Sequence, residues 1–338
     1  MRLPAEWENQ EFVQLTFPHK STDWFPILDD VLSCYRDMAS AISRFEPLLV
    51  VASDMDLARH TLSGIPNITF LPAPTNDTWA RDHGFITCLD EGELNYMDFQ
   101  FNGWGLKFAS NYDNQLNKRI WQSGLLKGTY IDCNDFVLEG GSIESDGAGT
   151  LMTTSSCLLA PNRNNKFSKE EIEQSLMKYF SVDQFLWLDH GQLAGDDTDG
   201  HIDTLARLCP NDTIAYVSCD DTEDEHFQEL KCMEEELKSF RTQSGQPYKL
   251  AALPLPDAIY DDDGERLPAT YANFLIINGA VLCPTYCQPE KDSTAMSLLQ
   301  TIFPDREIIG IDCRVLIRQH GSLHCCTMQY PSKACSNN

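Results

Sequence analysis

Residues 273–286 read NFLIINGAVLCPTY, two apolar runs separated by the dipeptide Asn278-Gly279. Asn-Gly between apolar runs is a strong signal for a β-hairpin with a tight two-residue turn. Residues 79–102 (WARDHGFITCLDEGELNYMDFQFN) and residues 136–163 (FVLEGGSIESDGAGTLMTTSSCLLAPNR) repeat this pattern more loosely. The sequence therefore predicts several hairpins of similar design along the chain.

Helical stretches follow the predicted hairpins. Residues 168–180 (SKEEIEQSLMKYF) begin with Ser168 three residues before Glu171, a pattern typical of a capping box at a helix start. Further helices are predicted over residues 26–45, 223–241 and 293–303, and closing strands over residues such as 48–52 and 307–311. The recurring unit is thus strand-strand-helix-strand.

This unit recurs about five times at a period of roughly 60–70 residues. Because one such unit cannot bury its apolar face alone, the repetition favours radial stacking of α/β units in a single domain over residues 1–338. A doubly wound fold of two domains is the competing interpretation. LEGGS at residues 138–142 lacks the G-x-G-x-x-G spacing of a phosphate loop, which argues against it.

Composition limits the partners of the chain. It has 25 Lys and Arg against 51 Asp and Glu, a formal net charge of −26. This charge argues against nucleic acid and against an anionic membrane, and it favours a cationic ligand. The 13 cysteines form no CxxC pair, and no apolar signal segment opens the chain, so we expect reduced thiols and a cytoplasmic protein. The sequence leaves a homo-oligomer open.

Four short segments carry polar residues beside apolar β runs: NDTWARDHG (76–84), LEGGS (138–142), GDDTDGHID (195–203) and HGSLHCCT (320–327). Strand ends and the loops next to them are where binding groups usually gather. Each segment could therefore direct a side chain toward a common centre.

Cys325 and Cys326 adjoin in the last of these segments. On an extended strand, neighbouring side chains face opposite sides, so only one of these thiols can face a given site. A cysteine nucleophile needs thiolate character, which a nearby cation supplies. The alternative interpretation is that both thiols are buried as small hydrophobic groups.

The third segment offers one imidazole among carboxylates. In an extended stretch, Asp197, Asp199, His201 and Asp203 would share one face. A His–Asp pair at this spacing can keep an imidazolium charged, as general acid/base catalysis requires. A metal site and a solvated acidic turn are the alternatives, although the segment lacks the residue order of a calcium loop.

Carboxylates from three segments, one His–Asp pair and one cysteine suit a planar cationic substrate. A guanidinium group has five N–H donors in a fixed fork, which carboxylates accept in pairs. Thiolate attack on its carbon, proton donation by His201 to the departing amine and attack by water would give a deimination. Alternatively, Arg81 and Asp82 form a local ion pair, Trp79 belongs to the core and Glu139 lies on an exposed β-bulge.

Four motifs resemble, in order, those of agmatine deiminases, which belong with bacterial-type peptidylarginine deiminases in the guanidine-modifying superfamily. They are Trp79-Ala80-Arg81-Asp82-x-Gly84, Leu138-Glu139-Gly140-Gly141, Asp197-Thr198-Asp199-Gly200-His201-Ile202-Asp203 and His324-Cys325-x-Thr327. The resemblance implies an α/β fold, a five-bladed α/β propeller with a central active site. It also implies no cofactor or metal, and conversion of agmatine to N-carbamoylputrescine and ammonia.

The resemblance also implies roles by motif position. Cys325 resembles the nucleophile, because the family reads His-Cys-(Ile/Val)-Thr there, and His201 resembles the acid/base with Asp203 as its companion. The remaining site residues are the guanidinium carboxylates Asp82 and Asp197, the acidic Glu139, the channel-lining Trp79 and the site-lining Asn273.

The chain departs from the family pattern beside the nucleophile, where His320 and Ser322 replace a glycine and an asparagine. A peptidylarginine or free-arginine deiminase is the second hypothesis, since Arg81 or Arg163 could hold a substrate carboxylate. More distant alternatives are a metal-dependent hydrolase centred on His201, a cysteine amidase and an inactive propeller that serves as a binding module.

Overall fold

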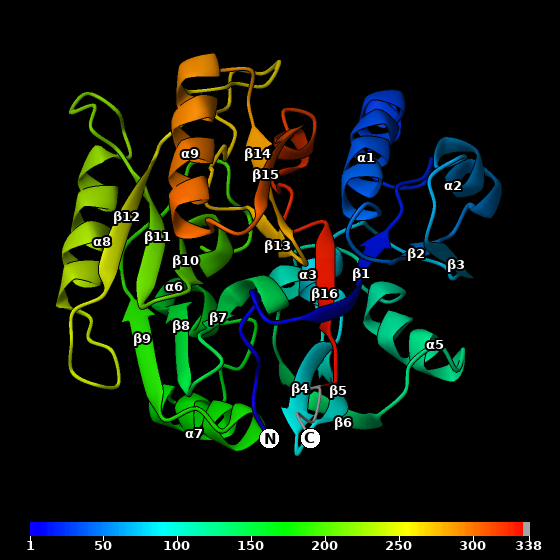
Figure 1. Cartoon of the computed structure of the whole chain (residues 1–338), viewed down its shortest axis with the longest axis horizontal. Helices are drawn as coiled ribbons and strands as arrows, with labels where there is room; N and C mark the ends of the chain where they lie inside the picture. Colours follow the sequence, from blue (N-terminus) through cyan, green and yellow to red (C-terminus); the bar gives the residue numbers. More distant parts are fainter. Residues whose placement is uncertain (334–338) are drawn as a thin grey trace.

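Five small sheets surround the centre of the molecule in the computed structural model, which describes residues 1–333 (Figure 1). One sheet has four strands and the others have three. This arrangement confirms the predicted five-bladed α/β propeller of strand-strand-helix-strand units. Residues 334–338, the end of the domain expected over 1–338, lie outside the described residues.

Each sheet is one blade. The four-stranded blade has the order β16-β1-β2-β3 and consists of β1 (Gln10–Thr16), β2 (Leu48–Ala52), β3 (Ile68–Pro72) and β16 (Thr327–Pro331). The others are β4 (Ile86–Asp90), β5 (Glu93–Gln100) and β6 (Thr129–Val137); β7 (Ile143–Ser145), β8 (Thr150–Thr154) and β9 (Gln184–Leu188); β10 (Ala206–Cys209), β11 (Thr213–Ser218) and β12 (Lys249–Pro254); and β13 (Leu275–Ile277), β14 (Ala280–Thr285) and β15 (Glu307–Asp312).

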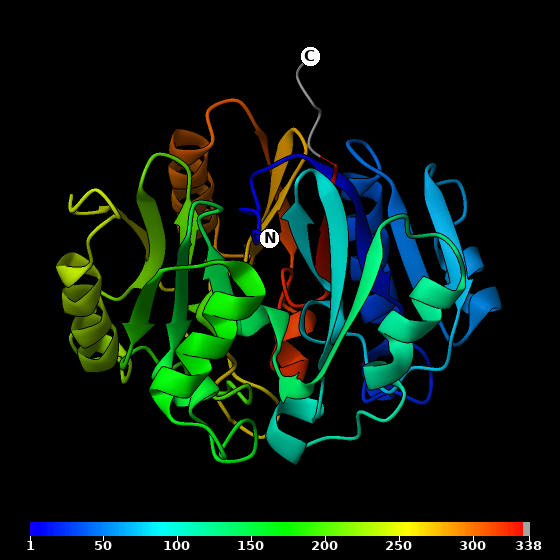
Figure 2. The same cartoon turned by 90° about the horizontal axis from the view of Figure 1, so that it is seen from below.

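Within each three-stranded blade the first two strands form an antiparallel hairpin and the third pairs in parallel. A parallel partner needs a crossover connection, and a helix supplies it here. These helices are α5 (Leu116–Gln122), α7 (Lys169–Phe180), α8 (Phe227–Ser239) and α9 (Pro289–Ile302), with α1 (Leu28–Ile42) and α2 (Met55–Thr61) in the four-stranded blade. Figure 2 shows the helices on the outer rim. No helix within residues 1–333 is long and apolar enough to cross a membrane.

The hairpin predicted at Asn278-Gly279 is confirmed. Ile277 pairs with Ala280 across this turn, where Gly279 has a φ of +72° that favours glycine. The capping box predicted at Ser168 and Glu171 is also present at the start of α7.

Helix α9 begins at Pro289, four residues before the predicted start at residue 293. Proline suits the first turn of a helix because its missing N–H has no partner there in any case. The helix therefore begins at a proline that lies before the apolar stretch from which the helix was predicted.

Both ends of the described chain contribute to one blade. Strand β16 pairs antiparallel with β1, so that Val13 faces Gln329 and Leu15 faces Thr327. Short helical segments connect successive blades, namely α3 (Ala80–His83) and the 3₁₀ turns η3 (Gly140–Ser142), η4 (Ile202–Thr204) and η5 (Leu316–Gln319). Others lie within the crossover connections of single blades, namely α4 (Gly103–Leu106), α6 (Ser155–Leu158), η1 (Phe25–Ile27) and η2 (Asp113–Gln115).

The fully buried Arg207 of β10 connects three blades. Its guanidinium donates to Glu144 of β7, to the main-chain oxygen of Ala272 and to Glu6 of the segment before β1. A buried arginine is tolerated only when its charge and its N–H groups have partners.

We expect Arg207→Met to lower the free energy of unfolding by about 3–5 kcal/mol, because it leaves the buried Glu144 without its cation. Denaturant unfolding measures the change. The matched control is Arg314→Met, which removes a pair between the half-exposed Arg314 and Asp312, and should cost only about 0.5 kcal/mol. Equal losses in the two variants would contradict the bridging role.

Candidate active site

The four polar segments of the sequence meet at the centre of the propeller. Asp82 lies in α3, Glu139 immediately precedes η3, Asp203 lies in η4, and Cys325 lies in the turn that leads into β16. Helix α3 contacts both η3 and β16, and η3 contacts η4. The common centre predicted from the sequence is therefore present.

A cavity leads to this centre. Twelve residues line it, namely Asp23, Asp77, Trp79, Asp82, Trp104, Phe108, Asp197, Thr198, Gln319, His320, Gly321 and Cys325. Four of them are aspartates, and no lysine or arginine is among these lining residues. The cavity wall is thus acidic and aromatic, and it suits a cation.

Cys325 and Cys326 point to different surroundings. They lie in a turn rather than on the extended strand that we expected. Cys325 still lines the cavity, whereas Cys326 is buried in the apolar core against Tyr35. Only one of the two thiols therefore reaches the cavity, although a turn rather than strand alternation separates them.

Asn273 holds the turn that carries Cys325. Its Oδ1 accepts from the backbone N–H of His324 at 2.9 Å, and its Nδ2 lies 3.3 Å from Cys325 Sγ. Burial, together with the charges of Asp203 and Asp82, raises the pKa of the Cys325 thiol well above its ordinary value. The thiol is therefore protonated at neutral pH.

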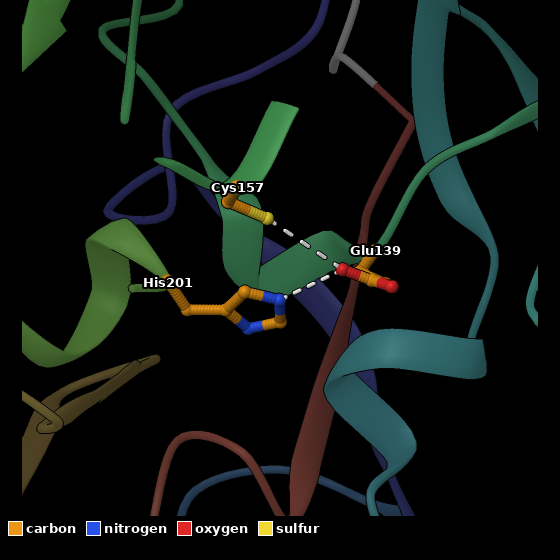
Figure 3. A group of neighbouring side chains, drawn as sticks. All are labelled: Glu139, Cys157 and His201. Atoms are coloured by element: carbon orange, nitrogen blue, oxygen red, sulfur yellow. Dashed lines mark hydrogen bonds and ion pairs between the residues drawn. The ribbon is translucent and has the colours of Figure 1, made fainter. Parts of the chain in front are cut away.

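The partner of His201 differs from the expected one. His201 Nε2 contacts Glu139 Oε2 at 2.9 Å (Figure 3), and its Nδ1 lies 3.5 Å from Asp82 Oδ1. The expected pair of His201 with Asp203 is wrong, because Asp203 contacts His324 instead. The backbone explains this: Asp199 has a φ of +68°, so the segment bends and does not alternate as a strand would.

The bend also separates the two other aspartates of this segment. Asp197 lines the cavity, as predicted. Asp199 does not share its face and pairs with Arg163 and Lys107. The single acidic face predicted from the alternation is therefore wrong.

Glu139 joins a buried ionic cluster. Arg163 Nε lies 3.0 Å from both carboxylate oxygens of Glu139, and Cys157 Sγ of α6 lies 3.7 Å from one of them (Figure 3). Burial alone would raise the pKa of Glu139, but its bond to His201 and the charge of Arg163 lower it. Although Glu139, Cys157 and His201 could together hold a metal ion, Arg163 already supplies the cation that Glu139 pairs with.

His201 carries its proton at neutral pH. Burial would lower the pKa of His201, but the charge of Asp82 and the contacts with Cys157 and Glu139 raise it well above its ordinary value. An imidazolium at this point can donate a proton to a leaving amine.

Asp82 and Asp203 lie close together beside Gly141, but only Asp82 is among the residues that line the cavity. Asp203 is fully buried, and its Oδ1 has no hydrogen-bond partner. Asp82 accepts from Trp104 Nε1 at 2.9 Å and from the Gly141 N–H at 3.0 Å. Burial raises the pKa of Asp82 to about 6 despite the charge of His201. A carboxylate oxygen without a partner can accept an N–H donor.

Gly141 shows how closely these groups converge. A Cβ placed on Gly141 would lie 2.6 Å from His201 Nδ1, 2.8 Å from Asp82 Oδ1 and 3.1 Å from Asp203 Oδ2. The glycine pair of LEGGS therefore makes room for the site itself.

We expect Gly141→Ala to reduce kcat/KM by about 100-fold, because displacing catalytic groups by even 1 Å carries a cost of that size. Steady-state kinetics measure the effect, and circular dichroism checks that the variant folds. Gly64→Ala is the control, since a Cβ there meets nothing within 4 Å; its φ of +80° makes alanine cost about 1–2 kcal/mol of stability, but the kinetics should stay unchanged. Unchanged kinetics in Gly141→Ala would show that the three groups do not act together.

Two tryptophans narrow the cavity. Trp79 packs against Trp24 with ring centroids 5.6 Å apart and leaves no space for a side chain at Gly321. Trp104 was missed in the sequence, as was Phe108 beside it. The sequence does contain a signal, because Trp104 stands between Gly103 and Gly105. In the structure Trp104 has a φ of +55°, which few tryptophans adopt.

The two arginines considered as carboxylate binders do not line the cavity. Arg81 faces Glu6 and Gln329, and Arg163 is used by Glu139 and Asp199. His320 is the one imidazole among the cavity-lining residues, and its Nδ1 contacts the Gly195 oxygen at 2.8 Å.

Solved structures share this fold. A structure from Porphyromonas gingivalis, provisionally named an arginine deiminase, is 52% identical with a TM-score of 0.93, covering 97% of this chain and 98% of that one. The agmatine deiminase of C. jejuni with substrate bound is 39% identical with a TM-score of 0.92, covering 98% and 96%.

The chain is also similar in sequence to proteins that are named agmatine deiminases. The agmatine deiminase of Pseudomonas aeruginosa (strain UCBPP-PA14) is 33% identical, covering 98% of this chain and 95% of that protein. The profile of the Porphyromonas-type peptidyl-arginine deiminase family matches residues 2–331. The chain belongs to this family.

Proposed function

We propose that the protein hydrolyses agmatine to N-carbamoylputrescine and ammonia. The observation that carries this proposal is a cavity with four aspartates and two tryptophans in its wall, which ends at a buried thiol. Agmatine carries a guanidinium and an ammonium group and no carboxylate. A wall without lysine or arginine among its described residues suits such a dication.

Asp82 and Asp203 are proposed to hold the guanidinium. Each offers a buried carboxylate near Cys325, and the unpartnered Oδ1 of Asp203 can accept a substrate N–H. Asp197 then serves as a third carboxylate on the cavity wall. The charge of the bound guanidinium favours the Cys325 thiolate, because it compensates the carboxylates that oppose it.

The thiolate of Cys325 forms a bond to the guanidinium carbon and gives a tetrahedral adduct. His201 donates a proton to one terminal nitrogen, the C–N bond breaks and ammonia leaves. An amidino-thioether on Cys325 remains. Water then adds to the same carbon and gives one proton to His201. The C–S bond breaks, the second water proton passes to the departing sulfur in place of the thiol proton released to solvent when the substrate bound, and the ureido product leaves. Glu139 keeps His201 oriented throughout.

Deimination of free arginine or peptidylarginine is the second candidate function. The name of the relative that is 52% identical favours free arginine, and that of the family favours peptidylarginine. Their carboxylate or backbone would have to meet His320 at the cavity wall, since Arg81 and Arg163 are engaged elsewhere. The acidic wall therefore favours agmatine.

The test is ammonia release from agmatine, arginine and a blocked arginine peptide, each with and without a chelator. Turnover of agmatine alone, unaffected by the chelator, supports the proposal. Turnover of the arginine compounds instead would keep the mechanism and change the substrate. Loss of activity in chelator would favour a metal-dependent hydrolase, and no ammonia from any compound would overturn the assignment.

A further inference from the structure

We propose that Glu6 and His324 are positioning residues of this active site, and that they hold Asp203 through a continuous carboxylate–imidazole–carboxylate chain. The inference rests on the proposed function, because it assigns Asp203 to the guanidinium. Glu6 comes from the segment before β1 and approaches the centre from outside the substrate cavity, whose lining residues do not include it.

The geometry of the chain is tight. His324 Nδ1 lies 2.7 Å from Asp203 Oδ2, and His324 Nε2 lies 2.7 Å from Glu6 Oε1. His324 and Asp203 are almost completely buried, with side-chain exposures of 1% and 0%, whereas Glu6 keeps 21%. Asp203 is thus fixed through one oxygen, which leaves Oδ1 for a substrate.

His324 holds Asp203 at one ring nitrogen and faces Glu6 at the other. An N–H at Nδ1 can donate to Asp203 Oδ2, while Nε2 lies 2.7 Å from Glu6 Oε1 and 3.1 Å from Arg207 Nη2. The contact with His324 and the charges of Arg207 and Arg81 hold the pKa of Glu6 well below its ordinary range despite burial. Glu6 is therefore a carboxylate that fixes this end of the ring together with Arg207.

Glu6 acts on His324 through the contact at Nε2. Burial and the charges of Arg207 and Arg81 lower the pKa of His324, although Glu6 and Asp203 oppose them. Without Glu6, we expect the ring to lose a fixed contact at Nε2 and Asp203 to lose a rigidly held partner. Its carboxylate would then be free to turn away from the guanidinium.

A second cavity reaches Glu6 from the other side. Its lining includes Ala5, Glu6, Arg81, Glu144 and Gln329, and it shares no residue with the substrate cavity. A small carboxylate from solution can therefore reach His324 when the Glu6 side chain is removed. Recovery of activity by such a carboxylate is a result that a purely structural role of Glu6 would not give.

The experiment compares wild type, Glu6→Ala and Glu11→Ala for ammonia release from agmatine, in sodium formate and in sodium chloride at equal ionic strength. Glu11 is an exposed acid of the nearby strand β1 and controls for the lost charge. We expect Glu6→Ala to lose about tenfold or more in kcat/KM, with a raised KM, and formate to restore part of it. Glu11→Ala should match wild type in both salts.

Glu6→Gln keeps the side-chain volume and covers the case in which Glu6→Ala does not fold; it should also raise KM. Kinetics of Glu6→Ala equal to those of Glu11→Ala would overturn the proposal. A loss of activity in Glu6→Ala that matches the loss of folded protein and is not reversed by formate would also overturn it. If wild type releases no ammonia, the proposed function fails first. Alkylation of Cys325 by iodoacetamide then decides, because only a positioning role makes its rate change in Glu6→Ala and revert in formate.

Discussion

Substitution of Cys325 by alanine is expected to reduce ammonia release from agmatine by about 10⁴-fold or more, because no other group can form the covalent adduct. Cys325 is the only one of the two adjacent thiols that lines the cavity. The measurement is a steady-state assay with enzyme concentrations high enough to detect residual turnover.

Cys326→Ala is the matched control for this variant. Its thiol lies against Tyr35 in the apolar core, so its removal should affect stability slightly and turnover by less than about threefold. Mass spectrometry of the wild-type enzyme quenched during turnover should find the amidino adduct on Cys325. Comparable losses of turnover in both variants would remove Cys325 from its role.

Replacing Asp82 by asparagine is expected to have opposite effects on two measurements. Turnover should fall by about 100-fold or more in kcat/KM, because a neutral amide cannot hold the guanidinium charge as a carboxylate does. Alkylation of Cys325 by iodoacetamide should become faster, because the Asp82 charge is one of the causes that raise the thiol pKa.

The pH dependence of alkylation shows whether the Asp82→Asn substitution lowers the pKa of the Cys325 thiol. Since the pKa of the wild-type thiol is raised, its alkylation should be slow at neutral pH and accelerate as the pH rises. In Asp82→Asn the acceleration should move to lower pH. Asp98→Asn is the control, because it removes a buried carboxylate bonded to Asn117 and Tyr130, away from the cavity lining. A slower alkylation in Asp82→Asn would contradict this account of the site.

Local signals predicted most of the fold. The dipeptide Asn278-Gly279 specifies its own turn, and Ser168 with Glu171 specifies a helix start, because each acts within a few residues. The repetition of such signals then indicated five blades. The boundary of α9 was less certain because its first turn, at Pro289, carries no apolar pattern.

The sequence indicated which residues gather at the site, but only partly which of them contact one another. Cys325, Asp82 and Asp197 line one cavity, as the motifs indicated. The pairing of His201 with Glu139 joins residues 62 positions apart, which no local rule predicts. The expected pair of His201 with Asp203 assumed an extended strand. Asp199 has a left-handed backbone, so the side chains of this segment do not alternate as they would in a strand.

The pairing of β16 with β1 fixes when the site can exist during protein synthesis. Cys325 lies in the turn just before β16, so it is among the last described residues to leave the ribosome, and Glu6 is among the first. The cavity residues Gln319, His320 and Gly321 also belong to this last part of the described chain. We therefore expect a nascent chain to lack both the complete cavity and its nucleophile until its two ends meet.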